Sequence, residues 1–186
     1  MIGLVLVSHG RLADEFLGAL EHVMGAQDRA ATVCIGPADD MEARRADIEA
    51  AIRATDAGDG VVVCTDMFGG TPSNLALAAM GSVSGGGPGS GMGSGVGSEA
   101  GSGGKGGAEG RERAAIAVEV LAGMNLPMLV KLAGVRAHKG LAECALIGQR
   151  AGRDYIKVAS VMLGRRSRTG SGGEGDEGGT SGGDAR

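Results

Sequence analysis

The chain has 186 residues, with 18 lysines and arginines against 22 aspartates and glutamates, and aromatic residues make up 2% of it. A sequence pI of ≈ 5.4 and the scarcity of stacking side chains argue against nucleic acid as a partner. No segment is long and apolar enough to cross a bilayer, and the apolar start lacks the basic region of a signal peptide. We therefore expect a cytoplasmic protein without direct membrane insertion.

The first part of the chain alternates apolar runs with segments of helical spacing. The unbroken apolar run at 2–7 predicts a buried strand, and apolar residues at helical spacing predict a helix over 12–24 that ends at Gly25. A short strand is predicted at 32–35. Asp39 or Asp40 can then cap a helix whose inner face carries Met41, Ile48 and Ile52.

Further along, a turn at 56–60 leads into a second strongly apolar strand at 60–65. Thr71 followed by Pro72 is typical of an N-cap and first helical residue, and this helix is predicted to run from 72 to about 80. The remaining elements are a strand at 115–121, a helix capped by Asn125 that continues through Leu132, and a last helix over about 141–163. Alternating strands and helices predict an α/β fold, an open, mostly parallel, doubly wound sheet flanked by helices in a single domain.

Glycine is concentrated in two stretches of the sequence. The chain holds 38 glycines, many of them mixed with serine and scattered charge at 81–113 and 164–186. Such segments bury too little apolar surface to offset the entropy of ordering. We predict a flexible insertion at 81–113, a disordered tail at 164–186, and a folded domain made of 1–80 and 114–163.

The cysteines do not form a pattern that holds a metal or a disulfide framework. They are three in number, far apart, and without a Cys-x-x-Cys pair. We expect reduced thiols in or near the core, no metal and no cofactor. The residues concerned are Cys34, Cys64 and Cys144.

Polar residues follow several of the predicted strands. His9 follows the first strand, Asp66 follows the strand at 60–65, and Asn125 comes shortly after the strand at 115–121. Ligands of doubly wound sheets bind beyond the carboxyl ends of the strands, near the switch in strand order. If the first and third strands are neighbours, His9 and Asp66 face each other across that crevice.

This pair suits phosphoryl transfer through histidine. A neutral imidazole is nucleophilic near pH 7, and a carboxylate on one ring N–H selects the tautomer and stabilises the positive ring as the N–P bond forms. The phosphoryl oxygens need donors, and a glycine-rich helix start supplies backbone N–H groups, the positive end of the helix and one hydroxyl. The candidate catalytic residues are His9 and Asp66, and the candidate phosphoryl-binding residues are Ser8, Gly10, Gly69, Gly70 and Thr71.

Each of these residues also has an ordinary structural interpretation. A lone histidine after a strand is more often incidental, Asp66 can cap a turn, and Gly69 and Gly70 can form a tight turn. The hypothesis depends on all of them meeting at one edge of the sheet. Two interpretations of Arg11 stay equal: a solvated charge, and a contact with a partner or a phosphate. Four other residues are expected at the surface, the last two in ion pairs: His22, His138, Arg44 and Arg45.

Three segments carry a resemblance to a known family, in the family's order along the chain. They are M-I-G-L-V-L-V-S-H-G-R-L-A, T-D-M-F-G-G-T-P-S-N and A-G-M-N-L-P-M-L. Together they resemble the mannose-family enzyme IIA proteins of the bacterial phosphoenolpyruvate-dependent sugar phosphotransferase system.

The resemblance implies specific roles and partners. His9 corresponds to the phosphorylated histidine, Asp66 to its carboxylate partner, and Thr71 to a serine or threonine near the phosphoryl group. It further implies an open α/β sheet, a homodimer, and phosphoryl donation by the small phosphocarrier HPr, itself charged by enzyme I. In sugar-transporting members the acceptor is an enzyme IIB domain.

The chain departs from the family in its Gly/Ser-rich insertion, where the family has a short connection, and in its Gly-rich tail, where no enzyme IIB domain is recognisable. The insertion precedes a strand that the family uses in dimer contacts, so the sequence does not decide whether this chain dimerises.

Regulatory phosphotransfer without sugar transport stays an alternative. A phosphotransfer subunit of a dihydroxyacetone kinase is disfavoured by the D-M-F-G-G-T-P-S-N segment. A flavodoxin-like protein is disfavoured by the lack of aromatic residues to hold a flavin.

Overall fold

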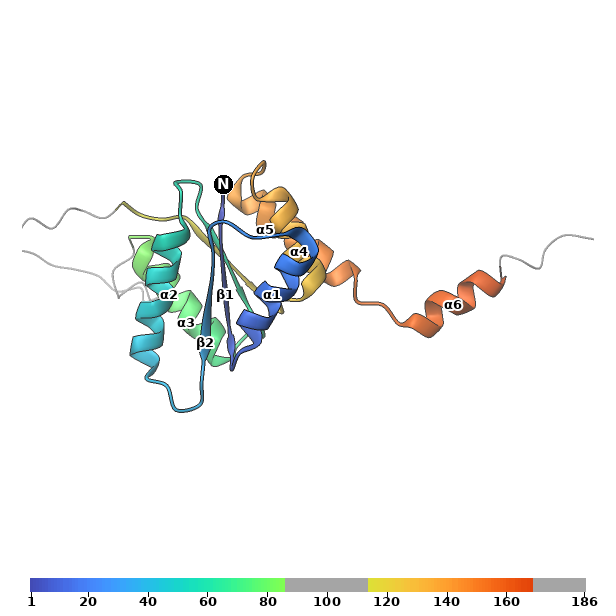
Figure 1. Cartoon of the computed structure of the whole chain (residues 1–186), viewed down its shortest axis with the longest axis horizontal. Helices are drawn as coiled ribbons and strands as arrows, with labels where there is room; N and C mark the ends of the chain where they lie inside the picture. The colour runs from blue at the N-terminus through green and yellow to red at the C-terminus, as the bar shows by residue number, and fades with distance from the viewer. Residues whose placement is uncertain (86–113, 169–186) are drawn as a thin grey trace, which may run out of the picture. The chain divides into compact units, whose positions relative to one another are not determined.

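A computed structural model of the chain describes residues 1–85 and 114–168. Within the described residues, Met1–Tyr155 form one compact α/β unit built on a four-stranded sheet (Figure 1). All strand pairs are parallel and the order is β2-β1-β3-β4, which confirms the predicted fold class. The strands are β1 (Gly3–His9), β2 (Ala30–Ile35), β3 (Val61–Thr65) and β4 (Val118–Ala122).

The strand order places the predicted site at a switch point. β1 pairs with β2 on one side and with β3 on the other, so the first and third strands are neighbours, as the sequence argument required. Val7 lies opposite Thr65 in the register. His9 is the last residue of β1, and Asp66 directly follows β3. Both therefore lie at the carboxyl edge of the sheet, at its topological switch point: β2 was added on one side of β1, and β3 and β4 on the other.

Helices cover both faces of the sheet (Figure 1). The apolar residues of each strand alternate between the two faces, since successive side chains of a strand point to opposite sides. Leu4 and Leu6 pack against α1, α4 and α5, whereas Val5 and Val7 pack against α2 and α3. The helices are α1 (Leu12–Met24), α2 (Met41–Thr55), α3 (Thr71–Val83), α4 (Leu126–Val135) and α5 (Leu141–Asp154).

Two of the predicted caps and the end of α1 are confirmed. Asp40 caps α2, because its side chain accepts a hydrogen bond from the Glu42 N–H at 2.9 Å. Asn125 caps α4 in the same way, with Met128 as donor at 3.1 Å. α1 ends at Met24, with Gly25 as its C-cap.

α3 differs from its predicted form at both ends. Its N-cap is Gly70, which has no side-chain cap hydrogen bond, and Thr71 is the first helical residue. The helix continues to Val83 because that side chain is buried in the core under α3. Residues 81–83 of the predicted insertion are therefore helical, and residues 86–113 lie outside the described residues.

The single last helix predicted at 141–163 is wrong. α5 ends at Asp154, and a separate helix, α6 (Ala159–Arg168), belongs to a second unit that begins at Ile156. Aromatic and β-branched residues have weaker helix propensity, and Tyr155, Ile156 and Val158 are exposed, so no packing compensates for it. Part of the predicted tail, 164–168, is helical, and 169–186 lie outside the described residues.

α5 packs on α4 through two glycines. A Cβ atom at Gly148 would lie 2.6 Å from Leu132 Cδ2, and one at Gly152 would lie 2.8 Å from Met128 Cε. The missing side chains let the two helices approach closely and bury the apolar face of α4, since interaxial distance depends on side-chain size.

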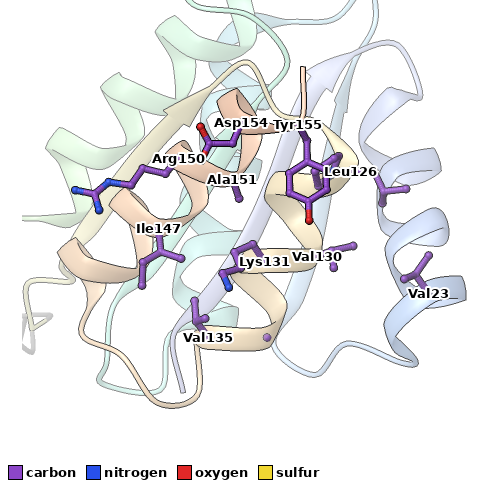
Figure 2. Close-up of a pocket in the computed structure, with 12 residues that line it drawn as sticks. Val23, Leu126, Val130, Lys131, Val135, Ile147, Arg150, Ala151, Asp154 and Tyr155 are labelled. Carbon is purple, nitrogen blue, oxygen red and sulfur yellow. The ribbon is translucent and has the colours of Figure 1, made fainter. Parts of the chain in front are cut away.

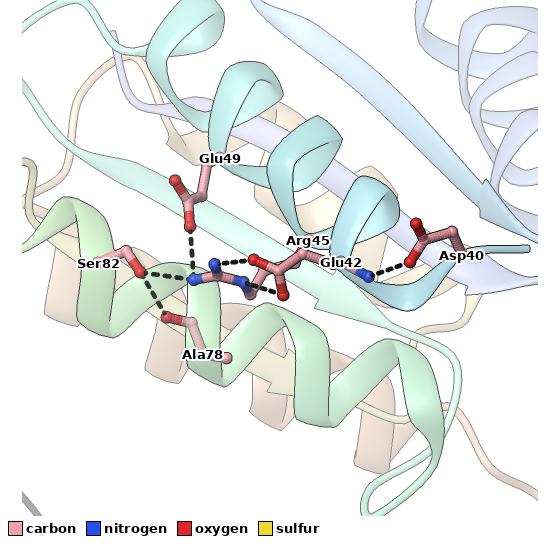
Figure 3. Close-up of polar contacts among 6 residues, drawn as sticks. All are labelled: Asp40, Glu42, Arg45, Glu49, Ala78 and Ser82. Atoms are coloured by element: carbon pink, nitrogen blue, oxygen red, sulfur yellow. Dashed lines mark hydrogen bonds and ion pairs between the residues drawn. The ribbon is translucent and has the colours of Figure 1, made fainter. Parts of the chain in front are cut away.

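Arg45 connects α2 to α3 across the surface (Figure 3). It pairs with Glu42 and with Glu49 on its own helix, the latter at 3.1 Å, and donates to Ser82 of α3 at 3.1 Å. Arg44 pairs with Asp47 at 2.6 Å. The expected surface pairing of both arginines is confirmed, and the contact with α3 is an addition that sequence spacing does not reveal.

The three cysteines, all within the described part of the chain, are free. Cys64 and Cys144 are buried and Cys34 is half-buried. Burial raises the pKa of the Cys64 thiol to about 12, which keeps it protonated and unreactive near neutral pH. Among the helices of residues 1–85 and 114–168, none has the length and hydropathy needed to span a membrane.

Arg136 is a buried cation that ties three segments together at the opposite edge of the sheet. Its guanidinium donates to the carbonyl oxygens of Ile2 at 3.1 Å, Asp28 at 2.6 Å and Arg29 at 3.4 Å, and to Gln27 Oε1 at 3.3 Å. Its side chain is almost fully buried, at 4% exposure. The start of β1, the loop before β2 and the end of α4 are thereby joined.

Replacing this residue is expected to destabilise the domain strongly. Arg136→Met removes the guanidinium donors from the carbonyl oxygens of Ile2 and Asp28, so the free energy of unfolding should fall by about 3 kcal/mol. Urea unfolding at pH 7 measures the difference. Lys139→Met is the matched control, because Lys139 pairs with Glu143 on the surface at 2.7 Å and its loss should change little. Equal losses in both variants would show that Arg136 has no special structural role.

Candidate functional site

His9 and Asp66 form a bonded pair at the carboxyl edge of the sheet. His9 Nδ1 lies 2.8 Å from Asp66 Oδ2, and the same oxygen accepts the backbone N–H of His9 at 2.9 Å. The other carboxylate oxygen accepts the Met67 N–H at 2.8 Å. The carboxylate thus holds the backbone and the ring of His9 together, and β1 and β3 bring the two residues side by side.

The pairing determines which ring nitrogen is free. An ionised carboxylate only accepts hydrogen bonds, so Nδ1 of His9 carries the hydrogen and Nε2 keeps its lone pair. The His9 side chain is 49% exposed and that of Asp66 is 12% exposed. The arrangement presents Nε2 as a nucleophile to solvent while the orienting carboxylate stays largely covered.

Opposing effects act on the Asp66 carboxyl. Burial acts to raise its pKa, but the hydrogen bonds from the His9 backbone, the His9 ring and the Met67 N–H together outweigh burial and hold the pKa below its usual value. Asp66 is therefore ionised near neutral pH, as the orienting interaction requires.

The start of α3 lies beside the free edge of the His9 ring. A Cβ atom built on Gly70 would be 3.0 Å from His9 Cε1 and 3.6 Å from His9 Nε2. The first N–H groups of a helix have no partner within the helix, so those of Thr71 and Ser73 are available there, while Pro72 has none. Gly69 adopts a φ of 80°, which favours glycine in the turn before the helix.

Two of the predicted phosphoryl-binding residues have other partners. Ser8 is fully buried and its Oγ accepts the Ala13 N–H at 2.7 Å, so it caps the first turn of α1. The Gly10 N–H donates to the Ile35 carbonyl at 2.8 Å. Hydrogen bonds within the fold occupy both groups, because β1 runs on through His9 and leads directly into α1. The structure places Gly70 against the His9 ring, with Gly69 and Thr71 as its chain neighbours, whereas the hydrogen-bonding groups of Ser8 and Gly10 have partners within the fold.

The remaining polar candidates are distributed as follows. Asn125 is engaged in capping α4 and donates to the Gly152 carbonyl at 3.3 Å, which ties it to α5. His22 and His138 are exposed, as expected. Arg11 is exposed at the N-cap position of α1, two residues after His9.

Sequence reasoning missed two residues near the pair. Phe68 is 79% exposed two positions after Asp66, and Ser73 is buried in the first turn of α3 with its hydroxyl unpaired among the described residues. Phe68 is one of two phenylalanines in the chain. Its place inside the glycine-rich segment is a signal that could have marked it, whereas the burial of Ser73 has no such signal.

Two hollows of the described part lie away from this pair. A groove of about 710 Å³ runs between α1, α4 and α5, with apolar walls and Lys131 in its middle (Figure 2). A second hollow of about 680 Å³ is lined by the turn at 56–60 and by 114–117. Neither is lined by His9 or Asp66, and the His9 side chain is 49% exposed to solvent.

The fold and this pair define an open α/β protein with a carboxylate-bound histidine at the switch point of its sheet. Residues 3–84 match the family model EIIA-man, described as PTS system fructose IIA component. The match includes the segments around His9 and Asp66, and the third motif lies beyond it. No curated protein sequence matches the chain at a significant level.

Solved structures share the fold of this chain. The mannose/sorbose specific IIA subunit from Enterococcus faecalis has 25% identity and a TM-score of 0.59, covering 84% of this chain and 93% of its own. The component EIIA from Streptococcus agalactiae has 20% identity and a TM-score of 0.61, covering 87% and 99%. The IIA protein associated with the fucose utilization operon of Streptococcus pneumoniae has 21% identity and a TM-score of 0.59, covering 86% and 95%.

These comparisons confirm the resemblance to mannose-family enzyme IIA components of the phosphotransferase system that the sequence motifs predicted. They support a phosphocarrier role in that system.

Proposed function

We propose that the protein accepts a phosphoryl group from phospho-HPr on Nε2 of His9 and passes it to an enzyme IIB-type acceptor. The observation that carries the proposal is the 2.8 Å contact of His9 Nδ1 with Asp66, which leaves Nε2 free beside the start of α3. The His9 side chain is exposed to solvent, which suits delivery by another protein better than capture of a small sugar. By family resemblance we further propose a cytoplasmic homodimer.

The transfer step uses few groups. The Nε2 lone pair forms a bond to phosphorus as the bond from phosphorus to the donor breaks, and that electron pair returns to the donor. The hydrogen on Nδ1 stays in place, and Asp66 stabilises the positive ring that results. The N–H groups at the start of α3 and the Thr71 hydroxyl are placed to hold the phosphoryl oxygens, whose charge the helix N-terminus favours. Onward transfer reverses the same step toward the acceptor.

A reconstituted relay tests the proposal. The full chain is incubated with phosphoenolpyruvate, enzyme I and HPr, and phosphate that is labile to acid and stable to alkali is measured on it. We expect one phosphoryl group, on the peptide that contains His9, and none when HPr is omitted. An unlabelled chain in a relay that labels a known acceptor would contradict the proposal. Labelled chain that transfers nothing to an enzyme IIB domain would favour the regulatory alternative.

Phe68 is expected to contribute to docking of the donor protein. Its side chain is 79% exposed beside Asp66, and exposed aromatic residues are enriched among residues that anchor protein partners. Phe68→Ala should raise the KM for phospho-HPr about tenfold with little change in kcat, because the ring would contribute to binding and not to the chemical step. Initial rates at several donor concentrations measure both quantities.

Leu146→Ala is the control for Phe68→Ala. Leu146 is 55% exposed but lies on α5, away from the paired histidine in the fold. We expect it to leave the KM unchanged. An equal rise in both variants, or a fall in kcat alone for Phe68→Ala, would contradict a docking role for Phe68.

A further inference from the structure

Gly70 occupies a position where another residue would serve the helix better. It is the N-cap of α3, with φ −77° and ψ 169°, an extended conformation that every residue type adopts. Serine, asparagine and aspartate are favoured at such positions because their side chains accept an N–H of the first turn. Here no side-chain cap bond is present. The backbone therefore does not explain the glycine, in contrast to Gly69 with its φ of 80°.

The space that a side chain would occupy at Gly70 is taken by the His9 ring. A Cβ atom would lie 3.0 Å from His9 Cε1, 3.6 Å from His9 Nε2 and 3.2 Å from Met67 Cγ. A separation of 3.0 Å is shorter than ordinary van der Waals contact, so one of the neighbours has to move by a few tenths of an ångström. Met67 is a flexible and exposed side chain, whereas the ring is held on its other edge by Asp66.

We propose that Gly70 is a positioning residue, whose lack of a side chain seats the His9 ring so that Nε2 faces the start of α3 while Nδ1 keeps its bond to Asp66. The inference rests on the proposed function for its activity readout. Its structural part, the contact between Gly70 and the ring, is testable in the unphosphorylated protein.

The proposal predicts that a side chain at position 70 slows phosphoryl transfer to His9 without lowering the stability of the fold. Gly70→Ser introduces a favoured N-cap residue, so the Tm should be unchanged or slightly higher. The same side chain displaces the ring, and small misplacements of reacting groups slow a reaction steeply, so His9 phosphorylation should be about tenfold slower. Gly70→Ala adds only the Cβ and should slow the reaction by a similar or smaller factor without improving the cap.

The ring itself supplies a readout that a purely structural role would not move. In ¹⁵N-labelled protein, the His9 ring nitrogens report the tautomer and the bond to Asp66. We expect both Gly70 variants to shift the His9 signals and to leave those of His22 and His138 unchanged. Gly81→Ala is the matched control, since Gly81 lies on the same helix with nothing within 4 Å of an added Cβ. It should alter neither the His9 signals nor the rate of labelling.

A double variant separates the two neighbours of the added Cβ. In Gly70→Ala with Met67→Ala, the contact with Met67 is removed and the contact with the ring remains. We expect the slow transfer to persist relative to Met67→Ala alone. Restoration of the rate by the second change, or unshifted His9 signals together with wild-type transfer in Gly70→Ala and Gly70→Ser, would overturn the proposal. If the His9 signals shift in the variants but phospho-HPr never labels the chain, the proposed phosphocarrier function is contradicted, and the contact between Gly70 and the His9 ring is supported.

Discussion

His9→Gln is expected to abolish labelling of the chain by phospho-HPr. The glutamine side chain has no nucleophilic nitrogen, since its amide lone pair is delocalised, so no N–P bond can form at this position. The His9 side chain is 49% exposed and its ring bonds to the Asp66 side chain, so the fold should persist without it. Acid-labile phosphate after incubation with phosphoenolpyruvate, enzyme I and HPr measures the loss, and circular dichroism verifies folding.

The other two histidines of the chain are the natural controls for His9→Gln. His22 and His138 are exposed on α1 and in the loop after α4. His22→Gln and His138→Gln should be labelled at the wild-type rate and to the wild-type extent. Label that survives in His9→Gln and disappears from one of these variants would move the phosphorylation site and refute the assignment.

Asp66→Asn is expected to slow phosphorylation of His9 by about 10³-fold without unfolding the protein. An amide can donate to Nδ1 through its NH₂ group, which would place the ring hydrogen on Nε2 and remove the lone pair that attacks phosphorus. The uncharged side chain also stabilises the positive phosphorylated ring less well. Single-turnover labelling at saturating phospho-HPr measures the rate, and an unchanged rate would remove Asp66 from the mechanism.

The same variant gives a pH dependence of stability with a defined sign. The pKa of Asp66 is lowered in the folded protein from the usual 3.8, because the carboxylate accepts three hydrogen bonds there. A depressed folded pKa contributes stability above the unfolded pKa, and this contribution is lost as the pH falls through the folded pKa. The part of the stability advantage of wild type over Asp66→Asn that comes from this carboxylate should therefore shrink as the pH falls below 3.8. Urea unfolding between about pH 5 and about pH 2.5 measures this part, and an advantage that grows as the pH falls below 3.8 would contradict the cause assigned.

Much of the fold follows from local pattern. Unbroken apolar runs predict strands covered on both faces, and the runs at the start of the chain and before Asp66 became the central strands β1 and β3. Asp40 and Asn125 predicted the starts of α2 and α4 correctly, because a capping side chain accepts an N–H of the first turn and this interaction is local in sequence. The pairing of His9 with Asp66 required only that these strands be adjacent.

Local pattern failed where distant contacts decide. A helix was expected to continue past Asp154, but α5 ends there, and the aromatic and β-branched residues that follow have weak helix propensity. Ser8 and Gly10 were candidates for phosphoryl binding because they flank His9. In the structure the Ser8 hydroxyl oxygen accepts the Ala13 N–H and the Gly10 N–H donates to Ile35, contacts that no spacing in the sequence reveals.

By itself the sequence determined the class of fold, the order of its elements and the identity of the candidate nucleophile and its carboxylate partner, because these depend on apolar periodicity and on motifs within a few residues. Only the tertiary structure decided which groups around His9 are free to act, since that depends on which hydrogen bonds the assembled strands and helices use. It also decided why Gly70 is a glycine. The reason is steric and lies 61 positions away in the chain, where the His9 ring fills the space that a side chain would need.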